Sequence, residues 1–387
     1  MSLAICQSYA MVPYGKETRG AVATQKRCKM RQTGKSDVAD IDLQEVAPAA
    51  QRCLLPGHAR GVSPQSTEQR RVESTAPESP LWGIVLAGGE GKRLRDFIRD
   101  HLRIDRPKQY CTLFGQDSML RQTLRRAELL IPPERLLTVV NDAHLAYAQA
   151  ELYDRRPETV IIQPCNRETA PGILLPLLHI HQQAPDAIVT LLPSDHFVFE
   201  EAQFMAAVET AAACVMAYPS HLVLLGIEST SPEVAYGWIG TGPVLGCVRG
   251  TALYQVQRFW EKPSHQLALT LYLNRYPWNT MVLVGRVGVL LERFQALVPE
   301  LIGPFHQLRS VLGTPQEAAM LQEIYATLPT VNFSQAILAR SAQCLGVLHV
   351  QGVYWNDWGD PQRVSADLAR FGKSPIRREE YRAIPTD

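Results

Sequence analysis

The feature that most constrains the fold is an alternation of short and long apolar segments, which begins at Leu81. The short segments are rich in Val, Ile and Leu, as buried strands are, and read LWGIVLA, LLTVVN, ETVIIQP, AIVTLLP and HLVLLGI. Between them, apolar residues recur at helical spacing in residues 118–130, 142–153, 169–183 and 201–217. This alternation predicts an α/β fold with a mixed, mostly parallel central sheet and helices on both faces. Less regular helices accompany the later strands, so we expect the second half of the sheet to be mixed.

Residues 1–80 have a different composition. They contain only two aromatic residues and are rich in Ser, Thr, Gln, Pro and Arg. Such a segment buries too little apolar surface to offset its ordering entropy, so we expect a disordered N-terminal extension. Its basic, acid-poor beginning resembles a transit peptide, and translation from Met11 or Met30 is an alternative. We expect one globular domain over residues 81–370 and a C-terminal tail over residues 371–387.

The overall charge and the cysteines exclude several classes of protein. The net charge of +1 creates no global field that would select nucleic acid or an anionic membrane. No apolar run approaches the ~18 residues that span a bilayer. The eight cysteines include no C-x-x-C pair, which argues against a disulfide framework or a zinc site. We expect a cytoplasmic protein with no nucleic-acid or membrane partner, and the sequence is compatible with a homo-oligomer.

A glycine turn follows the first predicted strand, in the sequence LAGGEGKRLRDFIRDHLRIDRPKQ of residues 86–109. A dinucleotide fingerprint requires G-x-G-x-x-G, but Leu94 stands at the third glycine. A P-loop requires G-x-x-x-x-G-K-[ST], but Leu86 and Arg93 occupy its first and last positions. The turn can still bring backbone N–H groups and a forked guanidinium close to phosphate oxygens. The alternative is a plain strand–turn–helix junction with solvated basic residues.

Several segments in a fixed order resemble the sugar-1-phosphate nucleotidyltransferases, in particular the mannose-1-phosphate guanylyltransferase family. The glycine turn is followed by Pro107-Lys108-Gln109, where that family has Arg-Pro-Lys-Gln. QPCNRETAPGI is similar to a guanine-contacting segment, and LLPSDH is similar to a metal-binding strand end. AYGWI, FWEKP and WNT are similar to sugar-binding elements, and GVYWNDWGD is similar to a final motif that carries a second metal ligand. The resemblance covers residues 81 to about 364.

The resemblance implies a Rossmann-like nucleotidyltransferase fold and transfer of a nucleoside monophosphate from GTP to mannose 1-phosphate, giving GDP-mannose and pyrophosphate. Both reactants are polyanions, so the site must neutralise charge, for which Mg²⁺ or another divalent cation is suited. The implied nucleotide-binding residues are Leu86, Ala87, Gly88, Gly89, Gly91, Pro164, Asn166, Glu168, Thr169 and Pro193. The implied sugar-phosphate-binding residues are Gly237, Glu261, Lys262 and Asn279. The implied catalytic residues are Arg93 and Lys108, and the implied metal ligands are Asp195 and Asp357.

The acidic candidates have structural alternatives. Asp195 ends a predicted strand, where α/β sheets bind ligands, but an aspartate there also suits a helix N-cap. Asp360 competes with Asp357 as the second carboxylate, and its alternative role is to cap the following turn. We favour Asp357 on the family resemblance. His196 is expected to be a packing residue rather than a ligand.

The basic candidates have alternatives as well. For Arg93 and Lys108 the alternative is a surface salt bridge, which contributes little stability. Lys108 follows a proline that fixes the local backbone, which favours a defined position for its side chain. For Glu261 and Lys262 the alternative is an ion pair at a strand end.

The sequence departs from the family pattern in four places: residues 95–105 are longer and charged, Glu168 replaces an asparagine, Met281 replaces a glycine, and residues 358–361 read WGDP. These departures leave two alternatives open. The chain could use a different base or sugar phosphate, or it could be a catalytically silent relative that binds nucleotide sugar and regulates a partner.

Overall fold

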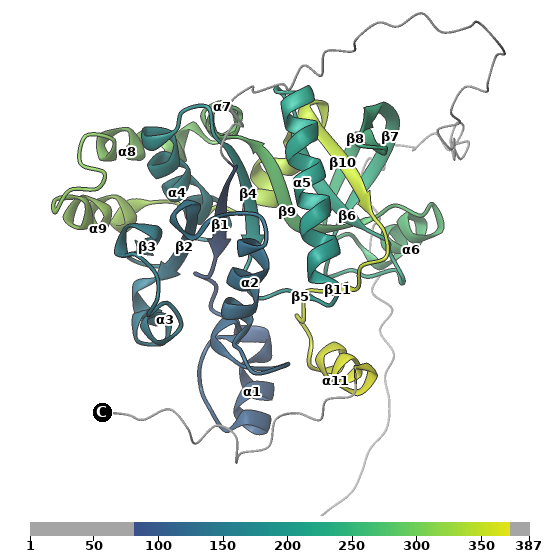
Figure 1. The fold of residues 1–387 in the computed structure, drawn as a ribbon, viewed down its shortest axis with the longest axis horizontal. Coiled ribbons are helices and arrows are strands. Elements are labelled where there is room, and N and C mark those ends of the chain that lie inside the picture. The colour runs from purple at the N-terminus through teal and green to yellow at the C-terminus, as the bar shows by residue number, and fades with distance from the viewer. Residues whose placement is uncertain (1–80, 372–387) are drawn as a thin grey trace, which may run out of the picture. The chain divides into compact units, whose positions relative to one another are not determined.

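A nine-stranded mixed sheet forms the centre of the structure, and a two-stranded sheet lies beside it (Figure 1). The computed structural model describes residues 81–371, so the predicted N-terminal extension and, apart from Phe371, the predicted tail lie outside the described residues. The strands are β1 (Leu81–Leu86), β2 (Leu136–Asn141), β3 (Val160–Gln163), β4 (Ile188–Pro193), β5 (Phe197–Val198), β6 (Leu222–Ile227), β7 (Gly237–Val248), β8 (Thr251–Glu261), β9 (Trp278–Arg286), β10 (Leu345–Val350) and β11 (Trp355–Asn356).

Helices connect most of the strands in the first half of the described chain. The α-helices are α1 (Arg95–Leu102), α2 (Met119–Glu128), α3 (Leu145–Glu151), α4 (Thr169–Gln183), α5 (Glu201–Ala217), α6 (His265–Leu273), α7 (Val287–Leu297), α8 (Pro299–Leu308), α9 (Glu317–Thr327), α10 (Phe333–Ala336) and α11 (Pro361–Arg370). The short 3₁₀ helices are η1 (Lys92–Leu94), η2 (Lys108–Tyr110), η3 (Pro133–Arg135), η4 (Asp142–His144), η5 (Pro157–Thr159), η6 (Leu338–Arg340) and η7 (Ala342–Cys344).

The sheet has the strand order β3-β2-β1-β4-β9-β6-β10-β8-β7. Strands β3, β2, β1 and β4 pair in parallel, as do β6 and β10. Strand β9 inserts antiparallel between β4 and β6, and β7 and β8 form an antiparallel hairpin at the edge. The predicted mixed sheet is therefore confirmed, but its mostly parallel character is confined to the first half.

The hairpin shows why the second half differs. Only Arg249 and Gly250 separate β7 from β8, and both have positive φ, 51° and 77°. Two such residues form a tight turn that joins antiparallel strands, whereas parallel strands need a longer crossover. Strand–helix alternation predicts only the connections that contain a helix.

The two faces of the sheet carry separate hydrophobic cores, because side chains alternate along each strand. Ile84 packs into one core with residues of α4, α7, α8 and α9. Its neighbour Val85 packs into the other core with residues of α2, α5 and α6. Figure 1 shows α5 lying across one face of the sheet. The prediction of helices on both faces is thus confirmed.

A third apolar cluster lies below the sheet and holds the last part of the described chain in place. It joins residues of α1 and α11 to Phe197 and Trp358, whose rings stack with centroids 4.5 Å apart. Beside it, β5 pairs antiparallel with β11, which aligns Phe197 with Asn356. This pairing brings the segment after β4 next to the segment that contains Asp357.

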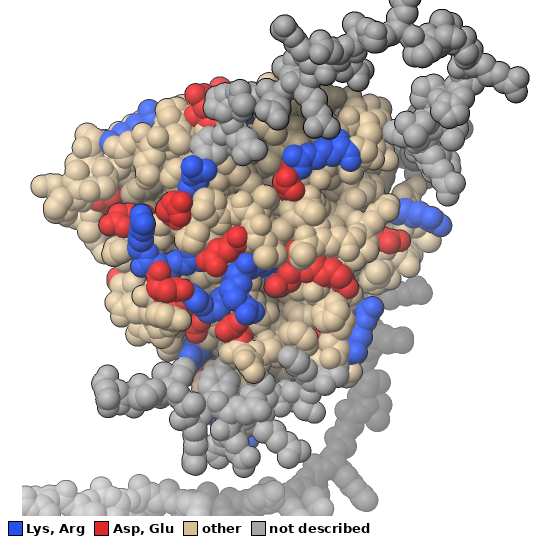
Figure 2. Space-filling model, viewed as in Figure 1, with Lys and Arg blue, Asp and Glu red and all other residues tan. Residues whose placement is uncertain are grey.

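Acidic and basic side chains are interspersed on the face seen in Figure 2, and they gather over α2. Arginines of α2 pair there with acidic partners, Arg121 with Asp154 at 2.6 Å and Arg125 with Asp117 at 2.8 Å. Opposite charges therefore neutralise one another over this helix. Among the described residues, no helix is long and apolar enough to cross a bilayer.

Candidate active site

The glycine turn after β1 comes close to the segment that contains Lys108. Gly91 has a left-handed φ of 61°, which favours glycine. A Cβ atom at this position would lie 2.9 Å from the backbone nitrogen of Lys108. Both the conformation and the close approach therefore require glycine here.

Two side chains of η2 stabilise the glycine turn by hydrogen bonds to its backbone carbonyls. The Gln109 side-chain amide donates to the carbonyls of Ala87 and Gly89 at 2.9 and 2.7 Å, and the Tyr110 hydroxyl donates to Ala87 O at 3.1 Å. Because a trans peptide directs its C=O and N–H in opposite directions, the N–H groups that follow these carbonyls point away from η2. The glycine turn thus presents backbone N–H donors on the side that faces away from η2.

A pocket of about 510 Å³ opens at the glycine turn. Of the predicted nucleotide-binding residues, it is lined by Leu86, Gly88, Gly89, Gly91, Asn166, Glu168 and Thr169, together with the predicted catalytic residues Arg93 and Lys108 and the predicted ligand Asp195. The other predicted nucleotide-binding residues, Ala87, Pro164 and Pro193, are not part of its lining. Ala87 is fully buried in the core behind the turn, so its side chain supports the loop.

The pocket is also lined by residues that the sequence motifs did not assign: Glu90, Lys92, Leu94, Val139, Gln163, Gly172, Thr330, Trp358 and Gly359. Gln163 and Gly172 lie within the segment that resembles a guanine-binding motif, so the motif could have indicated them. The buried Gln163 side chain accepts from the Tyr325 hydroxyl at 3.1 Å. Thr330 lies far along the chain, and no sequence pattern marks it.

Lys108 joins three separate segments of the chain. Its side chain is 5% exposed, and its ammonium lies 3.0 Å from Asp195 Oδ2. It also donates to the carbonyls of Asp357 and Trp358 at 2.6 and 3.2 Å. The buried position distinguishes Lys108 from a solvated surface lysine and places its positive charge between the Asp195 carboxylate and the backbone carbonyl of Asp357.

Asp195 lies two residues beyond β4. The preceding Ser194 hydroxyl donates to Leu86 O at 2.7 Å, which ties this segment to the end of β1. Burial acts to raise the pKa of Asp195, but the neighbouring cations, Lys108 first and Arg93 with it, outweigh burial and hold the pKa below the ordinary value. Asp195 does not cap a helix, since the N-cap of the following helix α5 is Glu200. The result is an ionised carboxylate at the pocket wall.

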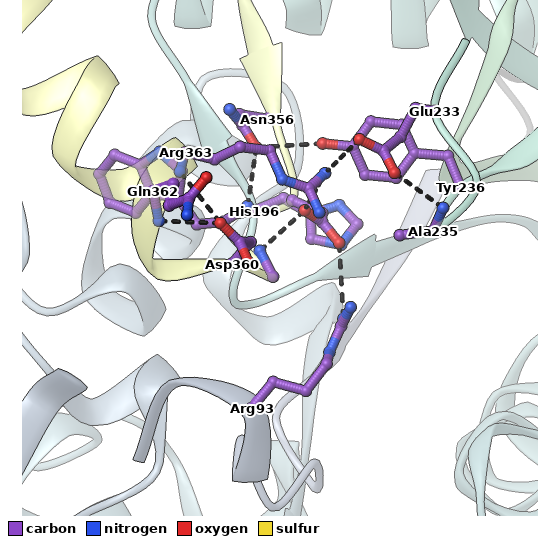
Figure 3. A network of polar contacts seen from close by, with 12 residues as sticks. Arg93, His196, Glu233, Ala235, Tyr236, Asn356, Asp360, Gln362 and Arg363 are labelled. Carbon is purple, nitrogen blue, oxygen red and sulfur yellow. Dashed lines mark hydrogen bonds and ion pairs between the residues drawn. The ribbon is translucent and has the colours of Figure 1, made fainter. Parts of the chain in front are cut away.

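Asp357 lies between two arginines. Its Oδ2 is 3.5 Å from Arg93 Nη2, and its Oδ1 is 3.4 Å from Arg363 Nη1. Oδ1 also accepts from the backbone N–H of Gly359 at 2.8 Å. Figure 3 shows Arg93 and Arg363 approaching from opposite sides. Asp360, the competing candidate, instead caps α11 by accepting from the backbone of Gln362 at 2.8 Å.

His196 packs inside the site. Its ring lies edge-on to Trp355, with centroids 5.2 Å apart, and burial lowers its pKa. These are the features of a neutral packing histidine. Among residues 81–371, no group of three or more His, Cys, Asp or Glu side chains is arranged to hold a metal ion. Of the two predicted metal ligands, Asp195 lines the pocket at the glycine turn, whereas Asp357 lies behind the lining residues Trp358 and Gly359 in the chain and is not itself part of the lining.

The four predicted sugar-phosphate residues lie together at the adjoining ends of three strands. Gly237 begins β7, Glu261 ends β8 with Lys262 after it, and Asn279 is in β9. A Cβ atom on Gly237 would lie 3.0 Å from Glu261 Oε2 and 3.3 Å from Asn279 Cβ, so glycine makes room for both. Burial raises the pKa of Glu261, and Lys262 Nζ, 3.9 Å from Glu261 Oε1, partly offsets this rise. None of the four lines the pocket at the glycine turn.

The two single-residue departures from the family pattern, Glu168 and Met281, adopt unusual backbone conformations. Met281 has φ 61°, and Glu168 has φ 69° and ψ −172°, a region that glycine normally occupies. The Met281 N–H donates to Asn279 Oδ1 at 3.2 Å, and the Glu168 N–H donates to Asn166 Oδ1 at 2.8 Å. Neighbouring amide side chains thus stabilise both turns.

Comparison with known proteins places these segments in one family. The nucleotidyl transferase family model matches residues 82–366. The xanthan biosynthesis protein XanB of Xanthomonas campestris pv. campestris (strain B100) is 31% identical over 287 residues, which cover 73% of this chain and 58% of XanB. A mannose-1-phosphate guanylyltransferase of Escherichia coli (strain K12) is 28% identical over 301 residues, 76% of this chain and 61% of that enzyme. The chain therefore spans about three fifths of the length of these relatives.

Solved structures share the fold. A Thermus thermophilus protein described as a mannose-1-phosphate geranyltransferase superposes with a TM-score of 0.62 at 29% identity, covering 77% of this chain and 81% of that one. A Helicobacter pylori protein described as a mannose-6-phosphate isomerase shares the fold at 20% identity, with a TM-score of 0.54, 72% of this chain and 99% of that one covered. Because the family match runs from β1 into α11 and includes every segment that lines the pocket, this chain belongs to the nucleotidyl transferase family.

Proposed function

We propose that the protein transfers a nucleoside monophosphate from GTP to mannose 1-phosphate, giving GDP-mannose and pyrophosphate. The observation that carries this proposal is the buried Lys108 ammonium, which joins Asp195 to the segment of Asp357 beside the glycine turn. Relatives that are named mannose-1-phosphate guanylyltransferases support the choice of substrates. In the reaction, an oxygen of the sugar phosphate attacks the α-phosphorus of GTP, and the bond to the β-phosphate breaks.

The glycine turn and two cations would hold the triphosphate. Backbone N–H groups of the turn point away from η2, and the Arg93 side chain is 62% exposed and free to fork onto phosphate oxygens. Lys108 is fixed by three oxygen partners, which occupy its three donors, so it would act on the triphosphate through its charge, which requires no reorganisation when phosphate arrives. Such preorganised charge stabilises the transferred and leaving groups. The attacking phosphate oxygen is already ionised, so no general base is needed.

Asp195 and Asp357 would hold Mg²⁺ or another divalent cation. The donor set fits, because Mg²⁺ binds through one or two carboxylates and completes its shell with phosphate oxygens and water. Each carboxylate pairs with a cationic nitrogen at its Oδ2, Lys108 at 3.0 Å and Arg93 at 3.5 Å, and a divalent cation would replace these partners at the oxygens that it binds. When bound, the metal would neutralise charge on the phosphates.

The remaining predicted residues would select the base and the sugar. The Glu168 carboxylate lines the pocket and can accept hydrogen bonds from guanine N–H groups, with Asn166 and Thr169 beside it. Gly237, Glu261, Lys262 and Asn279 would bind the sugar phosphate, Glu261 by accepting from hydroxyls and Lys262 by charge. The strained Met281 and Glu168 turns favour, as the second candidate, the same reaction with another sugar phosphate or base.

We further propose a cytoplasmic location for the protein. Cys111, Cys165, Cys214 and Cys344 are free thiols in the described structure. Free thiols, two of them buried in the core, are typical of a reducing compartment.

The experiment is pyrophosphate release with Mg²⁺ across a panel of nucleoside triphosphates and sugar 1-phosphates. Release with GTP and mannose 1-phosphate alone supports the proposal, and release with a different pair supports the second candidate. Asp195→Ala and Asp357→Ala should abolish turnover while leaving the protein folded. No release with any pair would refute the enzyme assignment and leave a silent nucleotide-sugar-binding protein.

A further inference from the structure

A buried carboxylate lies next to the Asp357 segment without belonging to any sequence motif. Asp367 is in α11, and its residue is 4% exposed. Its Oδ2 accepts from Asn356 Nδ2 at 2.9 Å and from Trp358 Nε1 at 2.8 Å. Its Oδ1 accepts from the Tyr354 hydroxyl. All three donors come from the five residues that end at Trp358.

The two donors to Oδ2 flank Asp357 in sequence. Asn356 and Trp358 are thereby tied to one oxygen atom, which fixes the backbone on both sides of Asp357. While Asn356 and Trp358 turn toward Asp367, the Asp357 carboxylate turns toward Arg93 and lies 3.5 Å from it.

The backbone conformation of Trp358 shows that contacts hold this segment in a strained geometry. Its φ is 44°, a left-handed value that costs a bulky residue conformational energy. Four contacts hold it there: its N–H donates to Asn356 Oδ1 at 3.0 Å, its carbonyl accepts from Lys108 at 3.2 Å, its indole bonds Asp367, and its ring stacks on Phe197. Strained residues persist where the surroundings over-determine them, and this occurs at functional sites.

Helix α11 also contacts the Asp357 carboxylate directly, through Arg363. Arg363 lies four residues before Asp367, on the same side of the helix, and its guanidinium is 3.4 Å from Asp357 Oδ1. Glu233 at 3.5 Å and the Tyr236 ring at 4.9 Å hold that guanidinium in turn (Figure 3). Asp367 therefore fixes the residues on both sides of Asp357, and Arg363 contacts the Asp357 side chain itself.

We propose that Asp367 is a positioning residue, which sets the Asp357 carboxylate for a divalent cation by binding both residues that flank it. The proposal rests on the proposed function only in that Asp357 is taken as a metal ligand. Partners that orient a ligand typically change metal affinity or activity roughly 10–100-fold when they are lost. Asp367 is predicted to have an effect of this size although it does not line the pocket.

The test compares Asp367→Leu with Asp367→Asn in the full chain. Leucine has a similar volume but leaves Asn356 and Trp358 without their acceptor. Asparagine keeps one oxygen for both donors and turns its amide toward the Tyr354 hydroxyl. We expect the dissociation constant for Mn²⁺, measured by electron paramagnetic resonance with GTP present, to rise roughly 10–100-fold in Asp367→Leu. In Asp367→Asn it should stay within a few-fold of the unaltered protein.

The matched control is Glu317→Leu. Glu317 also accepts two hydrogen bonds, from His179 at 2.8 Å and from the Gly313 N–H at 2.7 Å, and neither partner lines the pocket. It should lower the melting temperature without changing Mn²⁺ affinity. If Asp367→Leu does not fold, Asn356→Ala removes the donor of the same hydrogen bond. This variant should then show the weakened Mn²⁺ binding.

Unchanged Mn²⁺ affinity in the folded Asp367→Leu or Asn356→Ala protein overturns the proposal, as does an equal loss in Glu317→Leu. Absence of Mn²⁺ binding by the unaltered protein overturns it as well. Mn²⁺ binding that depends on Asp367, without pyrophosphate release from any substrate pair, would refute the proposed function and leave the positioning role intact.

Discussion

Replacing Lys108 with Met tests whether the buried ammonium holds the acidic segments together. The change keeps most of the apolar side chain but removes its contacts to the Asp195 carboxylate and to the carbonyls of Asp357 and Trp358. A hydrogen bond to a charged group contributes about 1.5–3 kcal/mol, and breaking a buried ion pair costs about 3–5 kcal/mol. The Asp195 side chain is 37% exposed and regains water, so we expect a loss of about 2–4 kcal/mol in unfolding free energy.

The assay is thermal unfolding at pH 7, in which this loss lowers the melting temperature by roughly 4–16 °C. The matched control is Lys92→Met. Its side chain is 76% exposed and pairs with Glu90 at 2.5 Å, and a surface pair of this kind contributes less than about 1 kcal/mol. Equal melting temperatures for the two variants would refute the reasoning, because the buried ammonium would then stabilise no more than the solvated one.

Three further predictions concern the same pocket and the sugar cluster. Gly91→Ala, which combines φ 61° with a Cβ 2.9 Å from a backbone nitrogen, should lose about 1–3 kcal/mol in urea unfolding; Gly89→Ala, with nothing within 4 Å, should lose less. Burial acts to raise the pKa of Asp195, but Lys108 and its other neighbours lower it below the value in the unfolded chain. Ionised Asp195 therefore stabilises the fold at pH values above its unfolded pKa. This stability is lost as the pH falls through the lower pKa of the folded protein. In Lys108→Met the loss should begin at higher pH, and coincident acid unfolding curves would contradict this. Glu261→Gln should raise the KM for sugar phosphate roughly tenfold, about 1.4 kcal/mol, and should remove the part of its pH dependence that arises from the raised pKa of the Glu261 carboxyl; an equal rise in the nucleotide KM would remove Glu261 from the sugar site.

The sequence predicts the parts of the fold that repeat locally. Strands β1 to β4 and the helices between them follow from apolar periodicity, because each pattern is complete within a few residues. Strands β5 and β11 have two residues each and carry no period. The antiparallel entry of β9 between β4 and β6 depends on pairing over long separations. Periodicity therefore predicted the first half of the sheet better than the second.

In the candidate site, too, the sequence predicts which residues take part but not the contacts that they make over long separations. The motifs named Lys108 and Asp357, but no pattern could show that one side chain is buried against the carbonyl of the other. Gln109 belongs to a motif, but the motif does not show that its side chain stabilises the glycine turn by donating to two backbone carbonyls. Asp360 suited both a cap and a ligand, and only the position of α11 decides for the cap. Asp367 has no motif, because its three donors are selected by packing.

The contacts from Lys108 to Asp357 and Trp358 span 249 and 250 positions of the chain. At translation rates of about 5–20 residues per second, the lysine emerges roughly 10–50 s before its partners exist. Contacts so distant also carry a large loop-closure entropy and form late in folding. The ammonium thus stays hydrated through most of synthesis, and the nascent protein joins Lys108 to the segment of Asp357 only as one of the last steps of folding.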